Sequence, residues 1–187
     1  MRIVGGSARG RTLRSVPGLA TRPTSDRVRQ SLFDLLGQRC DGLRILDLYA
    51  GTGALSFEAI SRGAVHATLV ESTRPAQAVI DRNAIELGFS PQITLVRAEV
   101  DRALGALSSR GAAFELVFAD PPYALEASQK LADALAAQGL VAPGGRAVLE
   151  RGKREAEPIA PQGFELLDDR AYGETMVAVL RRVAARD

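Results

Sequence analysis

From about residue 43 onwards, short continuous apolar runs alternate with segments whose apolar residues recur every three or four positions. The runs are the length of buried strands, and the segments between them have the periodicity of amphipathic helices. This alternation predicts an α/β fold with a mostly parallel, seven-stranded sheet that carries helices on both faces. The predicted strands are 44–49, 67–71, 93–96, 115–120, 146–150, 165–168 and 176–181, and the predicted helices are 54–62, 75–87 and 127–138.

The two ends of the chain depart from this alternation. The last two predicted strands are too close in sequence for a helical crossover, so we expect an antiparallel pair at the sheet edge. Near the other end, the apolar residues of 28–36 lie on one face of a predicted helix that begins near Thr24 or Ser25. The Gly- and Arg-rich residues before it predict a short hairpin, with a turn at Gly5-Gly6 or Pro17-Gly18. A further turn is predicted at Pro143-Gly144-Gly145.

Charge is distributed unevenly over the 187 residues, although the net charge is only +2. The first 30 residues carry a net charge of +6 and the remainder −4, which favours contact between the basic segment and a polyanion. We therefore divide the chain into a basic N-terminal extension, 1–30, and one α/β domain, 31–187. The arginines of the extension are Arg2, Arg9, Arg11, Arg14, Arg22, Arg27 and Arg29.

Composition excludes several other classes of protein. No apolar run approaches the ~20 residues of a membrane helix, and the first residues do not resemble a secretory signal, so we expect a cytoplasmic protein without a membrane partner. A single cysteine, Cys40, and a single histidine, His66, leave no Cys/His zinc site, and we predict no metal.

The first motif with chemical content follows the strand 44–49. Gly51 and Gly53 allow a tight turn and close approach to a ligand at the carboxyl end of a strand, where open α/β sheets bind ligands. Asp47 adds a carboxylate, and Glu71 ends the next strand 20 residues after Gly51, where an acid commonly accepts hydrogen bonds from ribose hydroxyls. Ser56 stands where a dinucleotide fingerprint has its third glycine. The pattern favours a ribose-containing cofactor other than NAD.

The second motif is Asp120-Pro121-Pro122-Tyr123, directly after the strand 115–120. Two consecutive prolines make a stiff turn without backbone N–H groups, so the turn is rich in acceptors. An exocyclic amine has two N–H groups, and the Asp120 carboxylate and the Pro121 carbonyl can accept one from each. Tyr123 can stack on the base that carries the amine.

These two motifs resemble class I S-adenosylmethionine-dependent methyltransferases, which have a Rossmann-like fold. The N-terminal stretches 2–6, 9–11 and 21–29, together with 61–64 and Asn83, resemble the bacterial 16S rRNA guanine-N2 methyltransferase family over nearly the whole chain. The resemblance implies transfer of a methyl group from S-adenosyl-L-methionine to a guanine N2 amine of 16S rRNA, within a small-subunit assembly intermediate. A monomer is the simplest oligomeric state. The resemblance also implies catalytic roles for Asp120, Pro121, Pro122 and Tyr123, cofactor contacts for Asp47, Tyr49, Gly51, Gly53, Glu71 and Glu99, and RNA contacts for Arg22 and Thr24. The charge of the basic segment adds Arg9, Arg11 and Arg14 as expected RNA contacts.

Three alternatives stay open at this point. The Asp-Pro-Pro-Tyr motif also occurs in adenine-N6 methyltransferases, which act on DNA or RNA. The DNA enzymes usually carry an added target-recognition domain, for which this chain has no room. A non-catalytic RNA-binding assembly factor would not need an intact motif, and a nicotinamide oxidoreductase is disfavoured by Ser56.

Overall fold

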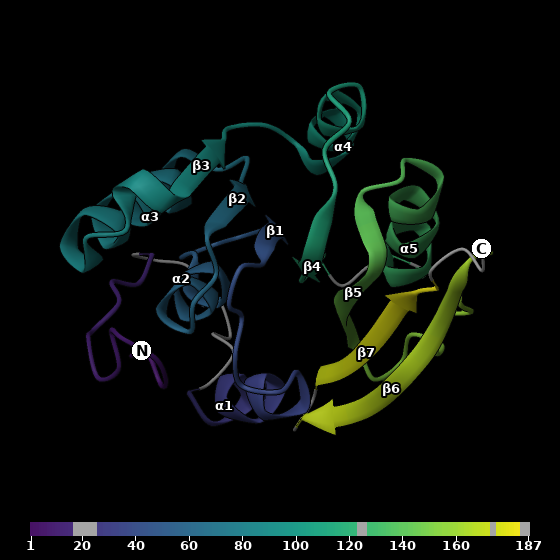
Figure 1. Cartoon of the computed structure of the whole chain (residues 1–187), viewed down its shortest axis with the longest axis horizontal. Coiled ribbons are helices and arrows are strands. Elements are labelled where there is room, and N and C mark those ends of the chain that lie inside the picture. The colour runs from purple at the N-terminus through teal and green to yellow at the C-terminus, as the bar shows by residue number, and fades with distance from the viewer. Residues whose placement is uncertain (17–25, 123–126, 173–174, 184–187) are drawn as a thin grey trace. The chain divides into compact units, whose positions relative to one another are not determined.

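The computed structural model describes residues 1–16, 26–122, 127–172 and 175–183. The chain forms two compact units, Met1–Glu99 and Val100–Asp187, whose helices and strands are labelled in Figure 1. In the described part of the chain, no helix is both long enough and apolar enough to span a membrane.

The first unit has three parallel strands in the order β3-β2-β1. Leu48 of β1 pairs with Val70 of β2, and Val70 pairs with Val96 of β3, so the carboxyl ends of the three strands are level. Helix α2 packs against β1 and β2. The elements of this unit are α1 (Asp26–Leu35), β1 (Arg44–Leu48), α2 (Ala54–Ser61), β2 (His66–Val70), α3 (Arg74–Leu87), the 3₁₀ helix η1 (Ser90–Gln92) and β3 (Ile93–Val96).

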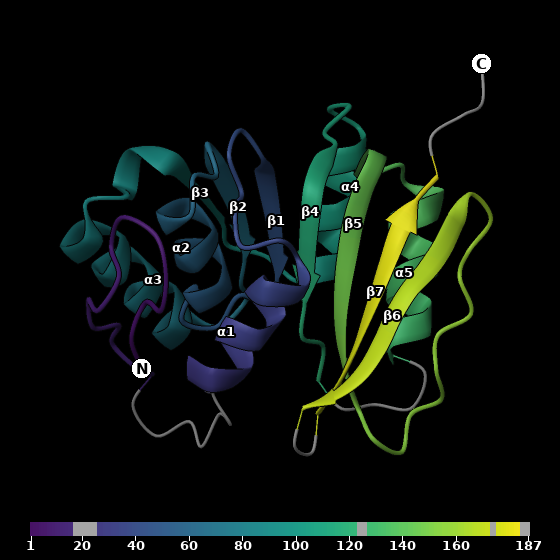
Figure 2. The ribbon, with the colours of Figure 1, turned by 60° about the horizontal axis from the view of Figure 1, so that its bottom comes forward.

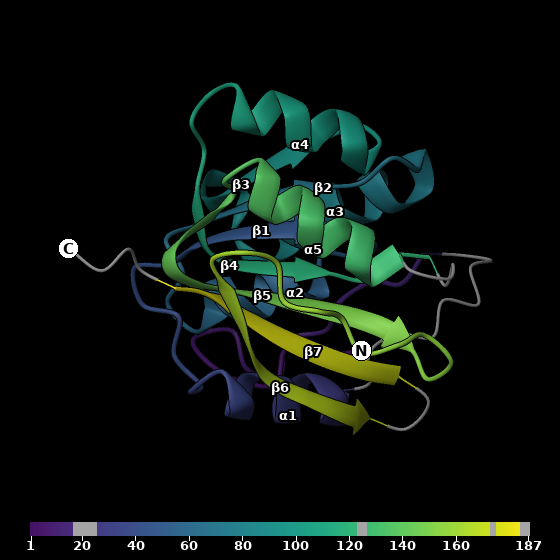
Figure 3. The same ribbon diagram turned by 90° about the vertical axis from the view of Figure 1, so that its right-hand side faces the viewer.

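The second unit has four strands in the order β4-β5-β7-β6. Strand β4 is parallel to β5, and β7 lies antiparallel between β5 and β6. Helices α4 and α5 lie on the same face of these strands (Figures 2 and 3). The elements are α4 (Val100–Ser108), β4 (Phe114–Ala119), α5 (Ala127–Ala137), β5 (Val141–Gly152), β6 (Phe164–Tyr172) and β7 (Thr175–Arg182).

The prediction of a mostly parallel sheet is wrong. Within the two units the described strands make three parallel pairs and two antiparallel ones, so the pairing is mixed. The short connection between β6 and β7 allows only a hairpin, so these two strands are antiparallel, and β7 also pairs antiparallel with β5. The antiparallel pair predicted from 165–168 and 176–181 is confirmed.

Two features of the second unit were not predicted from the sequence. Helix α4 was not predicted, although Val100, Ala103 and Leu104 share a buried face at helical spacing. Strand β5 begins five residues earlier than expected, and the predicted turn at 143–145 interrupts its register with β4 between Phe114 and Leu116.

The N-terminal segment folds onto the first unit, where Figure 2 shows it beside α2 and α3. Arg2 and Thr12 form an antiparallel bridge, which confirms a hairpin in minimal form. The Ser7 amide donates to the Ser61 carbonyl at 2.7 Å, and the Ala8 amide donates to the Ser61 hydroxyl at 2.9 Å. These bonds fix the segment to the end of α2. A separate extension, 1–30, stays a prediction.

The carboxylate of Glu58 is the centre of this attachment. It lies in the middle of α2 and is fully buried. It accepts hydrogen bonds from the amides of Val4 and Gly5, both at 2.8 Å, and from Arg62 Nε at 2.7 Å. Arg29 Nε lies 3.5 Å from its other side. Four donors thus surround one buried charge, as burial of a carboxylate requires.

The same cluster explains why α1 differs from its predicted pattern. The apolar stripe of 28–36 was expected to face the core, and Leu32 and Phe33 do so. Arg29 is also fully buried on this helix, whereas Val28 and Leu35 are half-exposed. Arg29 takes a core position because its guanidinium reaches Glu58, the carboxylate of Asp26 and the carbonyl of Arg2.

We expect Glu58→Gln to destabilise the protein by about 3 kcal/mol, because it leaves the buried Arg62 guanidinium without a counter-charge and leaves the buried Arg29 guanidinium with Asp26 alone. Thermal and urea unfolding measure the change. Glu86→Gln is the matched control, since Glu86 pairs with Arg14 in an exposed ion pair and contributes far less. Equal stability of the two variants would contradict the central role of Glu58.

Candidate functional site

The loop between β1 and α2 has an unusual backbone. Tyr49, Gly51 and Gly53 all have positive φ, at 60°, 57° and 77°. Gly53 immediately precedes α2, and a Cβ there would lie 2.6 Å from the Phe57 ring and 3.0 Å from Leu69 Cδ2. A side chain is therefore excluded at Gly53 by both backbone and packing, while Gly51 is required by its φ alone.

Glu71 meets this loop from the end of β2. One carboxylate oxygen accepts the Gly51 amide at 3.0 Å, and the other accepts the amide and hydroxyl of Thr73, both at 2.8 Å. The parallel pairing of β1 and β2 brings the two positions together across 20 residues of sequence. An acid beside a glycine-rich turn is the arrangement expected for a ribose site.

Asp47 is buried under the loop and is 3% exposed. Its Oδ2 accepts the Ser56 hydroxyl at 2.7 Å and the Ser56 amide at 3.3 Å. The serine at the place of a third glycine is thus a partner of Asp47 that fixes the first turn of α2. Asp47, Gly51, Gly53 and Glu71 form one group in the first unit, and Tyr49 lies between Asp47 and Gly51 in the same loop.

Glu99 is less closely involved. It is an exposed residue at the end of the first unit, three residues after β3. Its contact with a cofactor stays a prediction.

Asn83 is a site residue whose role the pattern did not indicate. It is 1% exposed on α3, and its amide nitrogen donates to the carbonyl of Thr52 at 3.0 Å. The same side chain accepts the Arg14 amide at 2.8 Å and donates to the Arg14 carbonyl at 3.3 Å. Asn83 therefore connects the N-terminal segment to residues 49–53, the loop between β1 and α2 that we call the cofactor loop. The available signal was an amide on the apolar face of the predicted helix 75–87, between Ile80 and Leu87.

In the second unit, Asp120 follows the last residue of β4. Pro121 behind it is buried, and Pro122 is exposed. Asp120 keeps an accessible surface, but the protein atoms around its carboxyl group displace part of the water, and this desolvation raises its pKa above the ordinary value of an aspartic acid. Tyr123, the fourth residue of the motif, lies outside the described residues.

The predicted RNA-binding arginines fall into two groups. Arg14 forms an ion pair with Glu86 at 2.6 Å, and Arg11 donates to the carbonyls of Glu86 and Leu87 at the end of α3. These two guanidinium groups are therefore engaged within the protein. Arg9 is exposed, and among the described residues its guanidinium has no partner. Arg22 and Thr24 lie outside the described residues.

Comparison with known proteins agrees with this arrangement. Residues 1–181 match the family described as Conserved hypothetical protein 95. Ribosomal RNA small subunit methyltransferase D of Escherichia coli (strain K12) is 30% identical over 184 residues, which are 98% of this chain and 91% of the relative. The chain belongs to the ribosomal RNA small subunit methyltransferase D family. The resemblance drawn from the sequence motifs is confirmed at the level of the family.

This family member is also similar to solved structures over nearly its whole length. The structure of yhhF from Escherichia coli is 32% identical with a TM-score of 0.85 and covers 98% of both chains. A hypothetical protein of Thermus thermophilus is 33% identical with a TM-score of 0.81 and covers 99% of both. The predicted Rossmann-like methyltransferase fold is thereby confirmed.

We expect Gly53→Ala to damage the cofactor loop much more than Gly88→Ala does. The two glycines have nearly the same φ, 77° and 79°, but a Cβ at Gly88 meets nothing within 4 Å. Gly88→Ala should cost about 1 kcal/mol, the penalty of a left-handed alanine. Gly53→Ala adds the overlap with Phe57, so it should lower the melting temperature further and weaken S-adenosylmethionine binding by at least about tenfold. Calorimetric titration and thermal unfolding test this, and equal effects of the two substitutions would contradict it.

Proposed function

We propose that the protein transfers the methyl group of S-adenosyl-L-methionine to the exocyclic N2 amine of a guanine in 16S rRNA. Methylation of ribosomal RNA is the activity that family membership supports. The observation that carries the finer assignment is the Asp120-Pro121-Pro122 turn at the end of β4, in a chain that also has the glycine loop with Asp47 and Glu71.

The first unit supplies the cofactor site in this proposal. Asp47, Tyr49, Gly51 and Gly53 border the methionine part, and the Glu71 carboxylate exchanges its bond with the Gly51 amide for bonds with the ribose hydroxyls. Glu99 contacts the adenine. When bound, S-adenosylmethionine supplies an electrophilic methyl group on its sulfonium.

The second unit holds the amine that accepts the methyl group. The lone pair of a guanine amine is delocalised into the ring, so the amine is a weak nucleophile. The Asp120 carboxylate and the Pro121 carbonyl accept its two N–H groups and direct the remaining lone pair at the methyl carbon. Pro122 keeps the turn stiff, and Tyr123 stacks on the base. Orientation of the reacting atoms then provides most of the rate enhancement.

RNA contacts by Arg9, Arg11, Arg14, Arg22 and Thr24 belong to the same proposal, with Arg9 as the most available cation. Arg11 and Arg14 contact RNA while bound to the end of α3, where their position is fixed. The substrate is a small-subunit assembly intermediate, and the protein acts as a monomer.

We expect Asp120→Ala to lower the rate of methyl transfer about 10²-fold, since it removes an acceptor that is aligned only in the reacting complex. Affinity for S-adenosylmethionine should be unchanged, because the cofactor loop lies in the first unit. Single-turnover transfer from labelled cofactor measures the rate, and calorimetric titration measures the affinity. Wild-type turnover in this variant would exclude Asp120 from the site.

The raised pKa of Asp120 predicts a pH dependence of the same step. Because burial disfavours the ionised carboxylate, the charged form reduces folding stability at neutral pH, and this reduction disappears as the pH falls through the raised pKa. Activity changes in the opposite direction, because the ionised carboxylate is a stronger hydrogen-bond acceptor for the amine N–H than the protonated carboxyl group. The rate should therefore fall on acidification at a pH above the ordinary Asp pKa of about 3.9. In Asp120→Asn this acid limb should be absent, and an unchanged limb would assign it to another group.

The proposed substrate is tested on small-subunit particles from a strain that lacks the gene. We expect labelled methyl groups to be incorporated into 16S rRNA, and mass mapping should place them on the N2 of one guanine. Label on an adenine N6 would support the adenine-N6 alternative. No incorporation together with tight RNA binding would support a non-catalytic assembly factor.

A further inference from the structure

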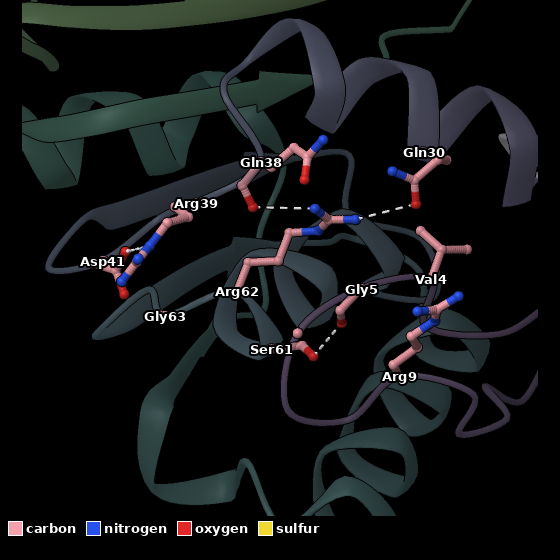
Figure 4. Close-up of a pocket in the computed structure, with 11 residues that line it drawn as sticks. Val4, Gly5, Arg9, Gln30, Gln38, Arg39, Asp41, Ser61, Arg62 and Gly63 are labelled. Atoms are coloured by element: carbon pink, nitrogen blue, oxygen red, sulfur yellow. Dashed lines mark hydrogen bonds and ion pairs between the residues drawn. The ribbon is translucent and has the colours of Figure 1, made fainter.

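A cavity lies in the first unit, away from the cofactor loop. Its volume is about 730 Å³ and it is open to solvent. Figure 4 shows Arg62 at its centre, with Gln30 and Gln38 on one side and Gly5 and Ser61 on the other. The full set of lining residues is Val4, Gly5, Gly6, Arg9, Gln30, Gln38, Arg39, Asp41, Ser61, Arg62 and Gly63.

The path of α2 separates this cavity from the cofactor site. Gly53 and the cofactor loop precede the first residue of the helix, while Ser61 and Arg62 form its end. Eight helical residues rise about 12 Å, so the two sites lie at opposite ends of α2. The cavity thus lies at the edge where β1 and β2 begin, and the cofactor residues lie where they end. It is a site separate from the glycine loop.

The lining is cationic. Three guanidinium groups, from Arg9, Arg39 and Arg62, line the cavity with one carboxylate, that of Asp41. Arg39 Nε lies 2.5 Å from Asp41 Oδ2, and this hydrogen bond holds the pKa of Asp41 below its usual range. The Arg39 side chain is nevertheless 82% exposed. Together with Arg9, which has no partner among the described residues, it leaves the cavity with a net positive charge at neutral pH.

Backbone strain also occurs at the cavity. Gln38 has φ of 64°, and among the described residues Tyr49 in the cofactor loop is the other non-glycine with positive φ. A left-handed residue other than glycine costs roughly 1–2 kcal/mol and persists mainly at functional sites. The Gln38 carbonyl accepts Arg62 Nη1 at 3.1 Å, which a glycine could do equally well. This backbone bond therefore does not explain why position 38 carries a glutamine side chain instead of glycine.

We propose that this cavity binds the phosphodiester backbone of the RNA substrate, at nucleotides other than the one that is methylated. The inference rests on the proposed RNA substrate and adds a second contact to it. Planar guanidinium groups bind phosphate oxygens through paired hydrogen bonds, and phosphate contacts fix the register of a nucleic acid. Arg9 and Arg39 contact phosphates, and the Gln38 amide contacts the adjoining sugar-phosphate. Arg62 already donates hydrogen bonds to Glu58, Gln38 and Gln30, so its role is to hold the lining residues Gln38 and Gln30 in position.

The test compares two double variants that remove the same charge. Arg9→Ala with Arg39→Ala changes the cavity. Arg110→Ala with Arg181→Ala is the control, because Arg110 is exposed and unpartnered among the described residues like Arg9, and Arg181 is in an exposed ion pair with Glu165 like Arg39. Binding of a 16S rRNA fragment is measured by fluorescence anisotropy over a salt series. The cavity variant should bind about tenfold more weakly than the control and lose about 1.4 from the log–log salt slope, roughly 0.7 for each contact.

Kinetics and a third variant distinguish RNA binding from a structural role. KM for RNA should rise in the cavity variant, while affinity for S-adenosylmethionine should stay at the control value, because the cavity and the glycine loop lie at opposite ends of α2. Gln38→Gly keeps the backbone carbonyl and removes the strain, so it should not lower the melting temperature, yet it should weaken RNA binding. If Gln38→Gly and the double cavity variant both bind RNA like the control, the proposal is overturned.

The remaining outcomes separate this proposal from the proposed function. Normal binding of naked RNA with slower methylation of ribosomal particles would overturn an RNA site and indicate a protein contact at the cavity. If the wild-type protein methylates guanine N2 while the cavity variants match the control, the methyl-transfer function stands, whereas the second site and the proposed RNA contact of Arg9 do not. If the wild-type protein transfers no methyl group to RNA, the proposed function fails, and the anisotropy comparison still decides whether the cavity binds RNA.

Discussion

The Glu58 carboxylate is the constraint on which the first unit depends, because a fully buried charge must be surrounded by donors. Its donors come from three separate parts of the chain: the amides of Val4 and Gly5, Arg29 on α1, and Arg62 just after α2. Removing any of them leaves a buried group without its partner. The N-terminal segment, α1 and α2 therefore share one electrostatic requirement, which adds to the burial of apolar residues such as Ile3, Leu32 and Phe57.

Helix α2 carries Glu58 in its middle and makes further hydrogen bonds at both of its ends. At its start, Ser56 binds Asp47 beneath the cofactor loop, and at its end, Ser61 binds the N-terminal segment. Asn83 joins the same segment to Thr52 in the loop. With the proposed RNA contact of the N-terminal segment, these bonds would connect RNA binding physically to the cofactor loop. RNA bound in the cavity would contact the end of the same helix, α2.

Much of the candidate cofactor site could be predicted because its chemistry is local. Gly51 and Gly53 are dictated by the turn itself, and Glu71 by its position at the end of the next strand. The Asp120-Pro121-Pro122 turn is visible for the same reason, as three adjacent residues after an apolar strand. The roles of Ser56 and Asn83 were not predicted, since each depends on a partner far away in sequence or on the other side of the loop. Helix α4 was not predicted, because its buried apolar face consists of only three residues.

The sequence alone determined the positions of most strands and helices, the family and the residues of both motifs, because apolar periodicity and turn chemistry are read from neighbouring residues. Tertiary structure decided which strands pair. The hairpin of β6 and β7 puts β7 beside β5 and makes the pairing mixed, which no pattern within a single strand specifies. It also decided that Arg29 is buried while Val28 is half-exposed, because the preference for an apolar residue inside gives way when a buried carboxylate lies within reach. Charge counting shows that residues 1–30 are basic, but only the fold shows that Arg11 and Arg14 are bound to α3, while the Arg9 guanidinium has no partner within the described part of the chain.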